Sequence, residues 1–229
     1  MRVKILLYQQ ELIGKIPEND YQIIKSYKPD FICLPEYFFH PDVVTFDASV
    51  SYMSKISLDI NCVLIGGSTV SKIEGKMYNT CFIFNRGKEI GFYNKIHLFQ
   101  PEMGKITPGN EYKLFSIKNV NFSVIICADV LYEDTWNELI KIKPQILFIP
   151  TFSPYKEENV KEKFLRDNKI YLEGAKKVGC FIIKTCCTGI FKTTKLQGRS
   201  LITGPDNILW RVNPEDEDKP QIKFYELII

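Results

Sequence analysis

The feature that most constrains the fold of this chain is a series of short apolar runs that alternate with helix-like segments. Residues 3–9, 31–34 and 62–65 have the length and composition of buried strands. Between them, residues 17–26 begin at a proline typical of a helix start, and residues 47–59 carry apolar side chains at helical spacing. This β-α-β-α beginning favours an α/β fold.

The rest of the chain departs from regular alternation. Residues 78–85 and 89–93 flank an Arg-Gly-Lys turn and are expected to pair as a hairpin, as are residues 113–117 with 122–126. We then expect helices at 136–142 and 159–178, strands at 145–149 and 180–185, a hairpin of 198–202 with 207–210, and a last strand at 224–229. The run Pro-Glu-Asp-Glu-Asp at 214–218 is expected to be an exposed acidic turn.

Composition places the chain among ordinary soluble globular proteins, with 45% hydrophobic and 25% charged residues. No linker-like stretch divides it, so we expect one domain over residues 1–229. Its 30 basic and 27 acidic residues nearly balance and the lysines are scattered, which argues against a nucleic-acid partner. No apolar run reaches the roughly 18 residues of a membrane span, and the chain starts directly in a strand. We therefore expect a cytoplasmic protein without a membrane partner.

The seven cysteines do not predict a disulfide framework. Four of them lie in apolar strand-like runs, where buried thiols are expected: Cys33, Cys62, Cys81 and Cys180. The adjacent Cys186-Cys187 lacks a second pair at zinc-ligand spacing, and the chain has only two histidines. We expect neither a metal nor another cofactor.

Reactive side chains stand where strand-like runs stop. The run Val124-Ile125-Ile126 passes into Cys127 just before a helix, and a thiol at such a turn lies near backbone N–H groups that favour a thiolate. By residue type alone, a small buried hydrophobe is the more frequent role of a free cysteine. Glu36 follows residues 31–34 and Lys95 follows residues 89–93. Because either charge is costly to bury alone, each implies an opposite charge nearby.

Glu36, Lys95 and Cys127, in this order, resemble the catalytic triad of the nitrilase superfamily of carbon–nitrogen hydrolases. Three further stretches are similar to the family: Cys127-x-Asp129, Leu165-Arg166 and Gly198-Arg199-Ser200. The resemblance implies a four-layer α-β-β-α sandwich with two mixed β-sheets. It also implies an amidase-like enzyme that cleaves a small carboxamide or N-carbamoyl compound, rather than a nitrile, through a cysteine thioester.

Other site residues follow from the resemblance and from position along the chain. Glu102, in an irregular loop at 99–110, lies near the family's second active-site glutamate, and a solvated loop carboxylate is an equal alternative. The Ala128 N–H is a candidate oxyanion donor. Aromatic residues after strand ends are expected on one rim, as candidates for the substrate pocket: Tyr37, Phe38, Phe39, Phe152 and Tyr155.

The chain departs from the family in ways that concern substrate and assembly. It has Ala128 and Leu131 where relatives often have an aromatic residue and an arginine, so no relative's substrate carries over directly. It also stops at its last core strand, whereas many relatives continue into an arm that crosses to a partner. We expect a homodimer built on outer helices, at residues 159–178 or near Trp136.

Three other functions remain open on these residues. A Cys–His hydrolase would use His97 as base, oriented by Asp129 or another acid. An acyltransferase would pass the acyl group from the thioester to an amine. A catalytically silent binding protein would have the same scaffold but no enzymatic activity.

Overall fold

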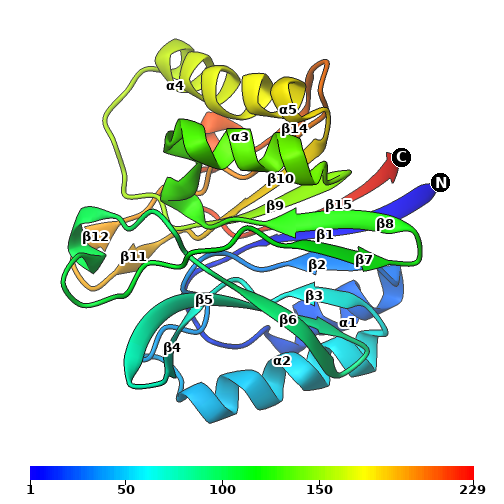
Figure 1. The fold of residues 1–229 in the computed structure, drawn as a ribbon, viewed down its shortest axis with the longest axis vertical. Helices are drawn as coiled ribbons and strands as arrows, with labels where there is room; N and C mark the ends of the chain where they lie inside the picture. Colours follow the sequence, from blue (N-terminus) through cyan, green and yellow to red (C-terminus); the bar gives the residue numbers. More distant parts are fainter.

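The computed structural model covers residues 1–229 and has four layers, in which two large β-sheets lie face to face and helices cover both outer sides (Figure 1). This arrangement confirms the predicted α-β-β-α sandwich. Both sheets are mixed, since each contains parallel and antiparallel strand pairs. None of the helices has the length and apolar composition needed to cross a membrane.

The first sheet has seven strands: β1 (Arg2–Gln9), β2 (Phe31–Cys33), β3 (Val63–Ile65), β4 (Thr69–Ile73), β5 (Lys76–Asn85), β6 (Lys88–Asn94) and β15 (Gln221–Ile228). Their order is β15-β1-β2-β3-β5-β4, with β6 also paired to β5. β1, β2 and β3 run parallel, and the other pairs are antiparallel. Because β15 pairs along the whole of β1, the two chain ends lie side by side (Figure 1).

The second sheet has six strands: β7 (Leu114–Ile117), β8 (Val120–Val124), β9 (Ile146–Thr151), β10 (Phe181–Cys186), β13 (Leu201–Thr203) and β14 (Ile208–Arg211). Their order is β14-β13-β10-β9-β8-β7, and the central β8, β9 and β10 run parallel. A separate two-stranded hairpin, β11 (Ile190–Phe191) with β12 (Thr194–Lys195), follows β10.

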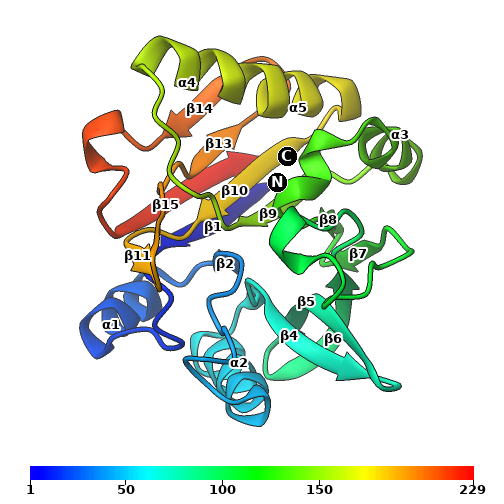
Figure 2. The ribbon, with the colours of Figure 1, turned by 90° about the vertical axis from the view of Figure 1, so that its left-hand side faces the viewer.

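Helices α1 (Glu18–Tyr27) and α2 (Phe46–Ile60) cover the first sheet, while α3 (Glu133–Ile142), α4 (Val160–Asp167) and α5 (Glu173–Val178) cover the second (Figures 1 and 2). The predicted helix at 159–178 is therefore present, but a π-helical turn, Asn168–Leu172, separates α4 from α5. Helix α4 starts with a capping box. The Asn159 side chain accepts a hydrogen bond from the Glu162 N–H at 2.9 Å, and the Glu162 side chain accepts one from the Asn159 N–H. Helix α5 ends at Gly179, whose φ of 73° suits glycine.

The residues of β1 explain why most positions of this strand are apolar. Val3, Ile5 and Leu7 belong to the core between the two sheets. Leu6 and Tyr8 alternate with them and pack in a second core, beneath α1 and α2. Because both faces of the strand are covered, these five side chains gain from burial, by about 1.5–3 kcal/mol for a Leu or Ile.

The fold corrects several predictions. β4 and the β11–β12 hairpin were not predicted, and the last strand begins at Gln221 rather than at residue 224. The acidic run at 214–218 is not simply exposed, because Glu217 is 8% exposed and its carboxylate accepts a hydrogen bond from Lys163. Arg199 also lies beside Glu217, with 3.7 Å between Nε and Oε1. Two buried cations therefore hold this acid in place. The four cysteines predicted to be buried are buried.

Candidate active site

Three strand ends bring the predicted catalytic residues together. Glu36 follows β2 in the first sheet, Lys95 follows β6, and Cys127 opens a 3-10 turn, Cys127–Leu131, after β8 in the second sheet. β6 lies antiparallel to β5, so its end meets the start of β5, where the Lys95 N–H donates to the Asn79 carbonyl at 2.9 Å. The site is thus assembled across the space between the two sheets.

Lys95 is held between two carboxylates. Its Nζ lies 2.8 Å from Glu36 Oε1 and 2.7 Å from Glu102 Oε2. The Lys95 side chain is only 2% exposed, so these partners replace the water that a buried ammonium requires. Burial opposes the charge, but the Glu36 carboxylate, with Cys127 and Glu102, outweighs it and raises the pKa of Lys95. Lys95 is therefore a fixed positive charge, with the opposite charges that its position in the sequence implied.

Both carboxylate oxygens of Glu36 accept hydrogen bonds. Oε1 accepts from Lys95 and from Asn79 Nδ2 at 2.9 Å, and Oε2 accepts from the Phe152 N–H at 2.7 Å. Burial is the strongest influence and raises the pKa of Glu36, although Lys95 opposes it. The direction could not be decided from the sequence, where burial and Lys95 act in opposite senses. A carboxyl group with a raised pKa is suited to accept and return a proton near neutral pH.

Cys127 lies beside Glu36 and is half-buried. Its thiol donates to the Phe152 carbonyl at 3.3 Å, so Phe152 contacts the carboxylate with its N–H and the thiol with its C=O. Burial and the charge of Glu36 raise the pKa of the Cys127 thiol well above its usual range, despite Lys95. The resting residue is therefore a thiol and not the thiolate that its position at a turn predicted, because burial and Glu36 disfavour the negative charge, so a base must take its proton before any attack.

The backbone of Cys127 is strained. Its φ is 44°, in the left-handed region that residues other than glycine adopt rarely and at a cost of about 1–3 kcal/mol. Asp129, fully buried, fixes this turn: Oδ2 accepts from the Ile126 N–H and the Tyr93 hydroxyl at 2.8 Å each, and Oδ1 accepts from the His97 N–H at 2.7 Å. One carboxylate thus joins the Cys127 turn to the segment after Lys95.

Glu102 is buried rather than solvated, with 8% exposure. Its Oε1 accepts from the Tyr37 hydroxyl at 2.6 Å and from Asn79 Nδ2 at 2.8 Å, while Oε2 accepts from Lys95 and from the Phe99 N–H. Burial alone would favour the neutral acid, but Lys95 and these hydrogen bonds lower the pKa of Glu102. Glu102 therefore stays ionised beside Lys95.

Asn79 is the site residue that sequence reasoning missed. Its single amide nitrogen donates to both Glu36 and Glu102. The available signal was an asparagine within a strand that continues as Thr-Cys-Phe-Ile-Phe, because asparagine is disfavoured in strands unless its side chain has a specific partner.

The imidazole of His97 has partners other than Cys127. It stacks on Tyr132 with 3.8 Å between ring centroids, and its Nε2 lies 3.2 Å from Asp134 and 3.3 Å from the Tyr112 hydroxyl. Within His97, Asp129 contacts the main-chain N–H and not the imidazole. The Cys–His alternative would require a hydrogen bond between the His97 ring and Cys127, and the structure has none.

The aromatic residues expected on one rim divide into three groups. Tyr37 and Phe152 are half-buried at the site, with ring centroids 6.1 Å apart. Phe38 and Phe39 are fully buried in the core beneath α1 and α2, so their predicted rim position is wrong. Tyr155 is 48% exposed and lies under the Lys195 ammonium.

The two positions that differ from the family also differ in exposure. Ala128 is buried directly after Cys127 in the 3-10 turn, where its N–H would have to serve as the oxyanion donor. Leu131, at the end of the same turn, is 63% exposed. The side chain that stands where relatives often have arginine is therefore largely in solvent.

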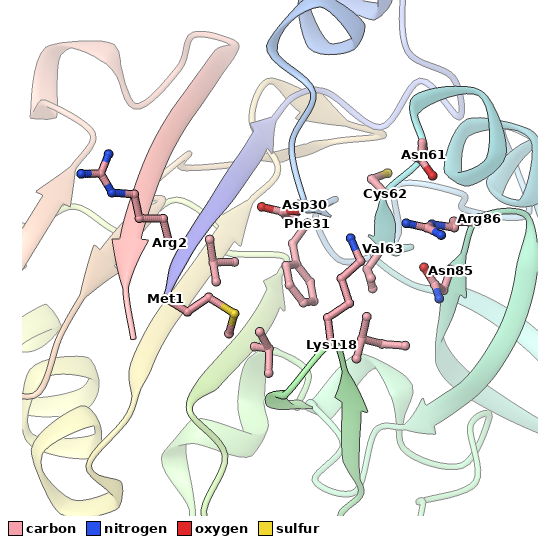
Figure 3. A pocket seen from close by; sticks show the side chains of 13 residues that line it. Met1, Arg2, Asp30, Phe31, Asn61, Cys62, Val63, Asn85, Arg86 and Lys118 are labelled. Atoms are coloured by element: carbon pink, nitrogen blue, oxygen red, sulfur yellow. The ribbon is translucent and has the colours of Figure 1, made fainter.

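A cavity of about 170 Å³ opens at the opposite end of the strands (Figure 3). It is lined where β1, β2, β3 and β8 begin and includes Asp30, Arg86 and Lys118, but none of the predicted triad. Arg86 and Lys118 are exposed, whereas Glu36 and Lys95 are buried against each other. Buried, mutually perturbed ionisable groups mark reactive sites better than exposed charged residues do, so the far strand ends are the candidate active site.

Comparison with known proteins supports the family that the sequence resembles. The family model described as Carbon-nitrogen hydrolase matches residues 7–223. Nitrilase homolog 2 of Dictyostelium discoideum is 31% identical over 140 residues, which are 52% of this chain and 43% of the relative. Omega-amidase NIT2 of Homo sapiens is 29% identical over 142 residues, 56% of this chain and 51% of the relative. The chain thus spans about half the length of the curated relatives it matches.

Two solved structures share the fold at low sequence identity. The carbon-nitrogen hydrolase from Helicobacter pylori G27 superposes with a TM-score of 0.81 at 18% identity, covering 99% of this chain and 89% of that one. A mutant of the amidase from Nesterenkonia sp. AN1 gives 0.79 at 18% identity, covering 98% and 90%. That amidase carries the acetamide moiety of fluoroacetamide covalently on its active site cysteine.

Proposed function

The chain belongs to the carbon–nitrogen hydrolase family, and on this premise we propose that it hydrolyses a small carboxamide or N-carbamoyl compound through a thioester on Cys127. The single observation that carries the proposal is the position of Glu36. This buried acid contacts the Lys95 ammonium at 2.8 Å and lies beside the Cys127 thiol. An acid, a cation and a proposed nucleophile then lie together at one site, as acyl transfer to a thiol requires.

Glu36 acts first as the general base. It takes the proton of the Cys127 thiol as the sulfur attacks the carbonyl carbon of the substrate. The carbonyl oxygen becomes negative in the tetrahedral intermediate, and Lys95 with the Ala128 N–H stabilises it. Loss of one such donor typically lowers the rate by about 10²–10³-fold.

Glu36 then acts as the general acid. It returns the proton to the nitrogen, so that ammonia or an amine leaves and a thioester stays on Cys127. Proton transfer of this kind is typically worth about 10²–10⁴-fold in rate. Glu36 next deprotonates a water molecule that attacks the thioester, and the thiol recovers its proton as the acid product leaves.

Glu102 is proposed to keep Lys95 charged through these steps. Whenever Glu36 carries a proton, Lys95 loses one of its two negative partners. The Glu102 carboxylate, whose pKa is lowered, remains paired with the same ammonium at 2.7 Å. Tyr37 and Asn79 orient Glu102 through its other oxygen.

The substrate class is tested by ammonia release from a panel of amides, carbamoyl compounds and nitriles. The omega-amidase relatives and the amidase of similar fold favour amides. Turnover of nitriles without cleavage of any amide would refute the substrate class. Product analysis with and without an added amine separates hydrolysis from acyl transfer.

The mechanism is tested by mass spectrometry of the protein mixed with a substrate that it turns over. We expect an acyl adduct on Cys127, none in Cys127→Ala, and loss of turnover in Glu36→Gln. Acylation mapped to another cysteine, or undiminished turnover by Cys127→Ala, would overturn the mechanism.

A further inference from the structure

Four aromatic rings beside the proposed catalytic residues form a closed circuit of edge contacts. Tyr37 contacts Phe152 with centroids 6.1 Å apart, and Phe152 contacts Phe191 at 6.2 Å. Phe191 contacts His40 at 4.6 Å, and His40 returns to Tyr37 at 5.5 Å. All four side chains are only half-buried, so each keeps part of its surface free. We call these residues the aromatic wall.

The aromatic wall begins at the reacting atoms. Phe152 contacts Glu36 through its N–H and Cys127 through its C=O, and Tyr37 is the residue directly after Glu36. Leu12, Cys187 and Leu196 are buried behind the wall and pack against it. Because Phe152 contacts both Glu36 and Cys127, the wall starts where the acyl group of a substrate bound at Cys127 would lie.

Phe191 is held in the wall by the β11–β12 hairpin. It pairs with Thr194, whereas Ile190 pairs with Lys195, so Phe191 and Ile190 lie on opposite faces of the hairpin. Ile190 is 72% exposed, and Phe191 faces Phe152. The Tyr155 N–H donates to the Lys195 carbonyl at 2.8 Å, which attaches the hairpin to the segment that carries Phe152.

The basic side chains at the wall are already engaged. Burial lowers the pKa of His40, and its Nδ1 accepts the Asp42 N–H at 3.1 Å, so the imidazole is neutral at pH 7. The Lys192 ammonium forms an ion pair with the Asp42 carboxylate. A carboxylate on the acyl group of a substrate would lose water at the rings and would find His40 neutral and Lys192 already paired, which is unfavourable.

We infer that the aromatic wall is the acyl-binding surface and that it selects amides with an uncharged, apolar acyl group, with Phe191 as a specificity-determining residue. This inference rests on the proposed function. It adds the chemistry of the acyl group and assigns a role to the hairpin.

The test compares kcat/KM for butyramide and succinamate, which match in chain length and differ in a terminal methyl against a carboxylate. We expect butyramide to be preferred by at least about 10-fold, because the carboxylate finds no unpaired partner. Phe191→Ala should raise KM for butyramide by about 10-fold with little change in kcat, since the ring offers apolar contact away from the reacting atoms. Ile190→Ala, on the outer face of the same hairpin, is the matched control and should leave both constants unchanged.

The outcomes separate the inference from the proposed function. Succinamate turned over as fast as butyramide, or Phe191→Ala kinetics equal to wild type, would overturn the inference and leave the hydrolase intact. Turnover of neither compound, together with no adduct on Cys127, would overturn both. Thermal unfolding of each variant shows that it is folded, and Phe191→Leu replaces Phe191→Ala if the latter is not.

Discussion

Replacing Asp129 by asparagine tests whether a buried carboxylate holds the nucleophile in place. The side chain is fully buried and accepts three hydrogen bonds, from the N–H groups of Ile126 and His97 and from the Tyr93 hydroxyl. Asparagine has the same shape but only one oxygen. In either orientation its NH₂ group faces a donor N–H, so at least one buried N–H loses its acceptor.

The size of the effect follows from these contacts. A hydrogen bond to a charged group is worth about 1.5–3 kcal/mol, and a buried donor left unpaired costs about 1–3 kcal/mol. We expect Asp129→Asn to lower the free energy of unfolding by about 2–4 kcal/mol. Because Cys127 depends on this turn for its φ of 44°, kcat should also fall, by about 10–100-fold, as expected for a nucleophile displaced by up to about 1 Å.

Urea unfolding and steady-state kinetics at a temperature where the variant is folded measure the two effects separately. Asp134→Asn is the matched control, since this carboxylate is 65% exposed and contacts His97 from the surface. It should change the free energy of unfolding by no more than about 0.5 kcal/mol. An Asp129→Asn protein with the unfolding midpoint and kcat of the wild type would refute the reasoning.

Four further predictions concern the charges and the assembly. Glu102 raises the pKa of Glu36, whose base form is lost as pH falls, so Glu102→Gln should move the acidic limb of the kcat/KM profile to lower pH. Lys95→Met should lower kcat by about 10²–10³-fold. It should also lower the free energy of unfolding, measured in urea, by about 3–5 kcal/mol, since two buried carboxylates lose their cation. His97→Ala should keep most of the wild-type kcat in steady-state kinetics, and near-complete loss of turnover would favour the Cys–His alternative. Light scattering should give a dimer, twice 26.6 kDa, and a single-chain mass would contradict it.

The short central strands, such as the β2 strand that precedes Glu36, were predictable because their side chains are buried on both faces. β2 and β3, for example, occupy Phe31–Cys33 and Val63–Ile65, within one residue of the predicted runs. β4 gave no such signal, because its buried positions are hydroxyls: Thr69 and Ser71 are 2% and 1% exposed. Ser71 meets Thr80 of β5 at 2.6 Å, a partner that apolar periodicity cannot reveal.

Side-chain direction after a strand was harder to predict than the strand itself. Tyr37 has a φ of 58°, in the left-handed region, which turns the chain sharply at this residue. The Tyr37 side chain therefore reaches Glu102, whereas Phe38 and Phe39 pack in the core. A period-based expectation treats successive aromatic residues after a strand as equivalent. Glu217 illustrates the same limit over distance, since its burial depends on Lys163, which is 54 residues away in the chain.

The charge balance of the site explains why two glutamates accompany a single lysine. With Glu36 as the only partner, Lys95 would be left buried and unpaired each time Glu36 accepted the thiol proton, at a cost of several kcal/mol. The fixed Glu102 carboxylate, 2.7 Å from the ammonium, removes that cost, and its own charge raises the pKa of Glu36. In the proposed mechanism, the same residue would therefore keep the cation charged and make Glu36 a better base. Asn79 holds both acids with one amide, so the two effects depend on a single geometry.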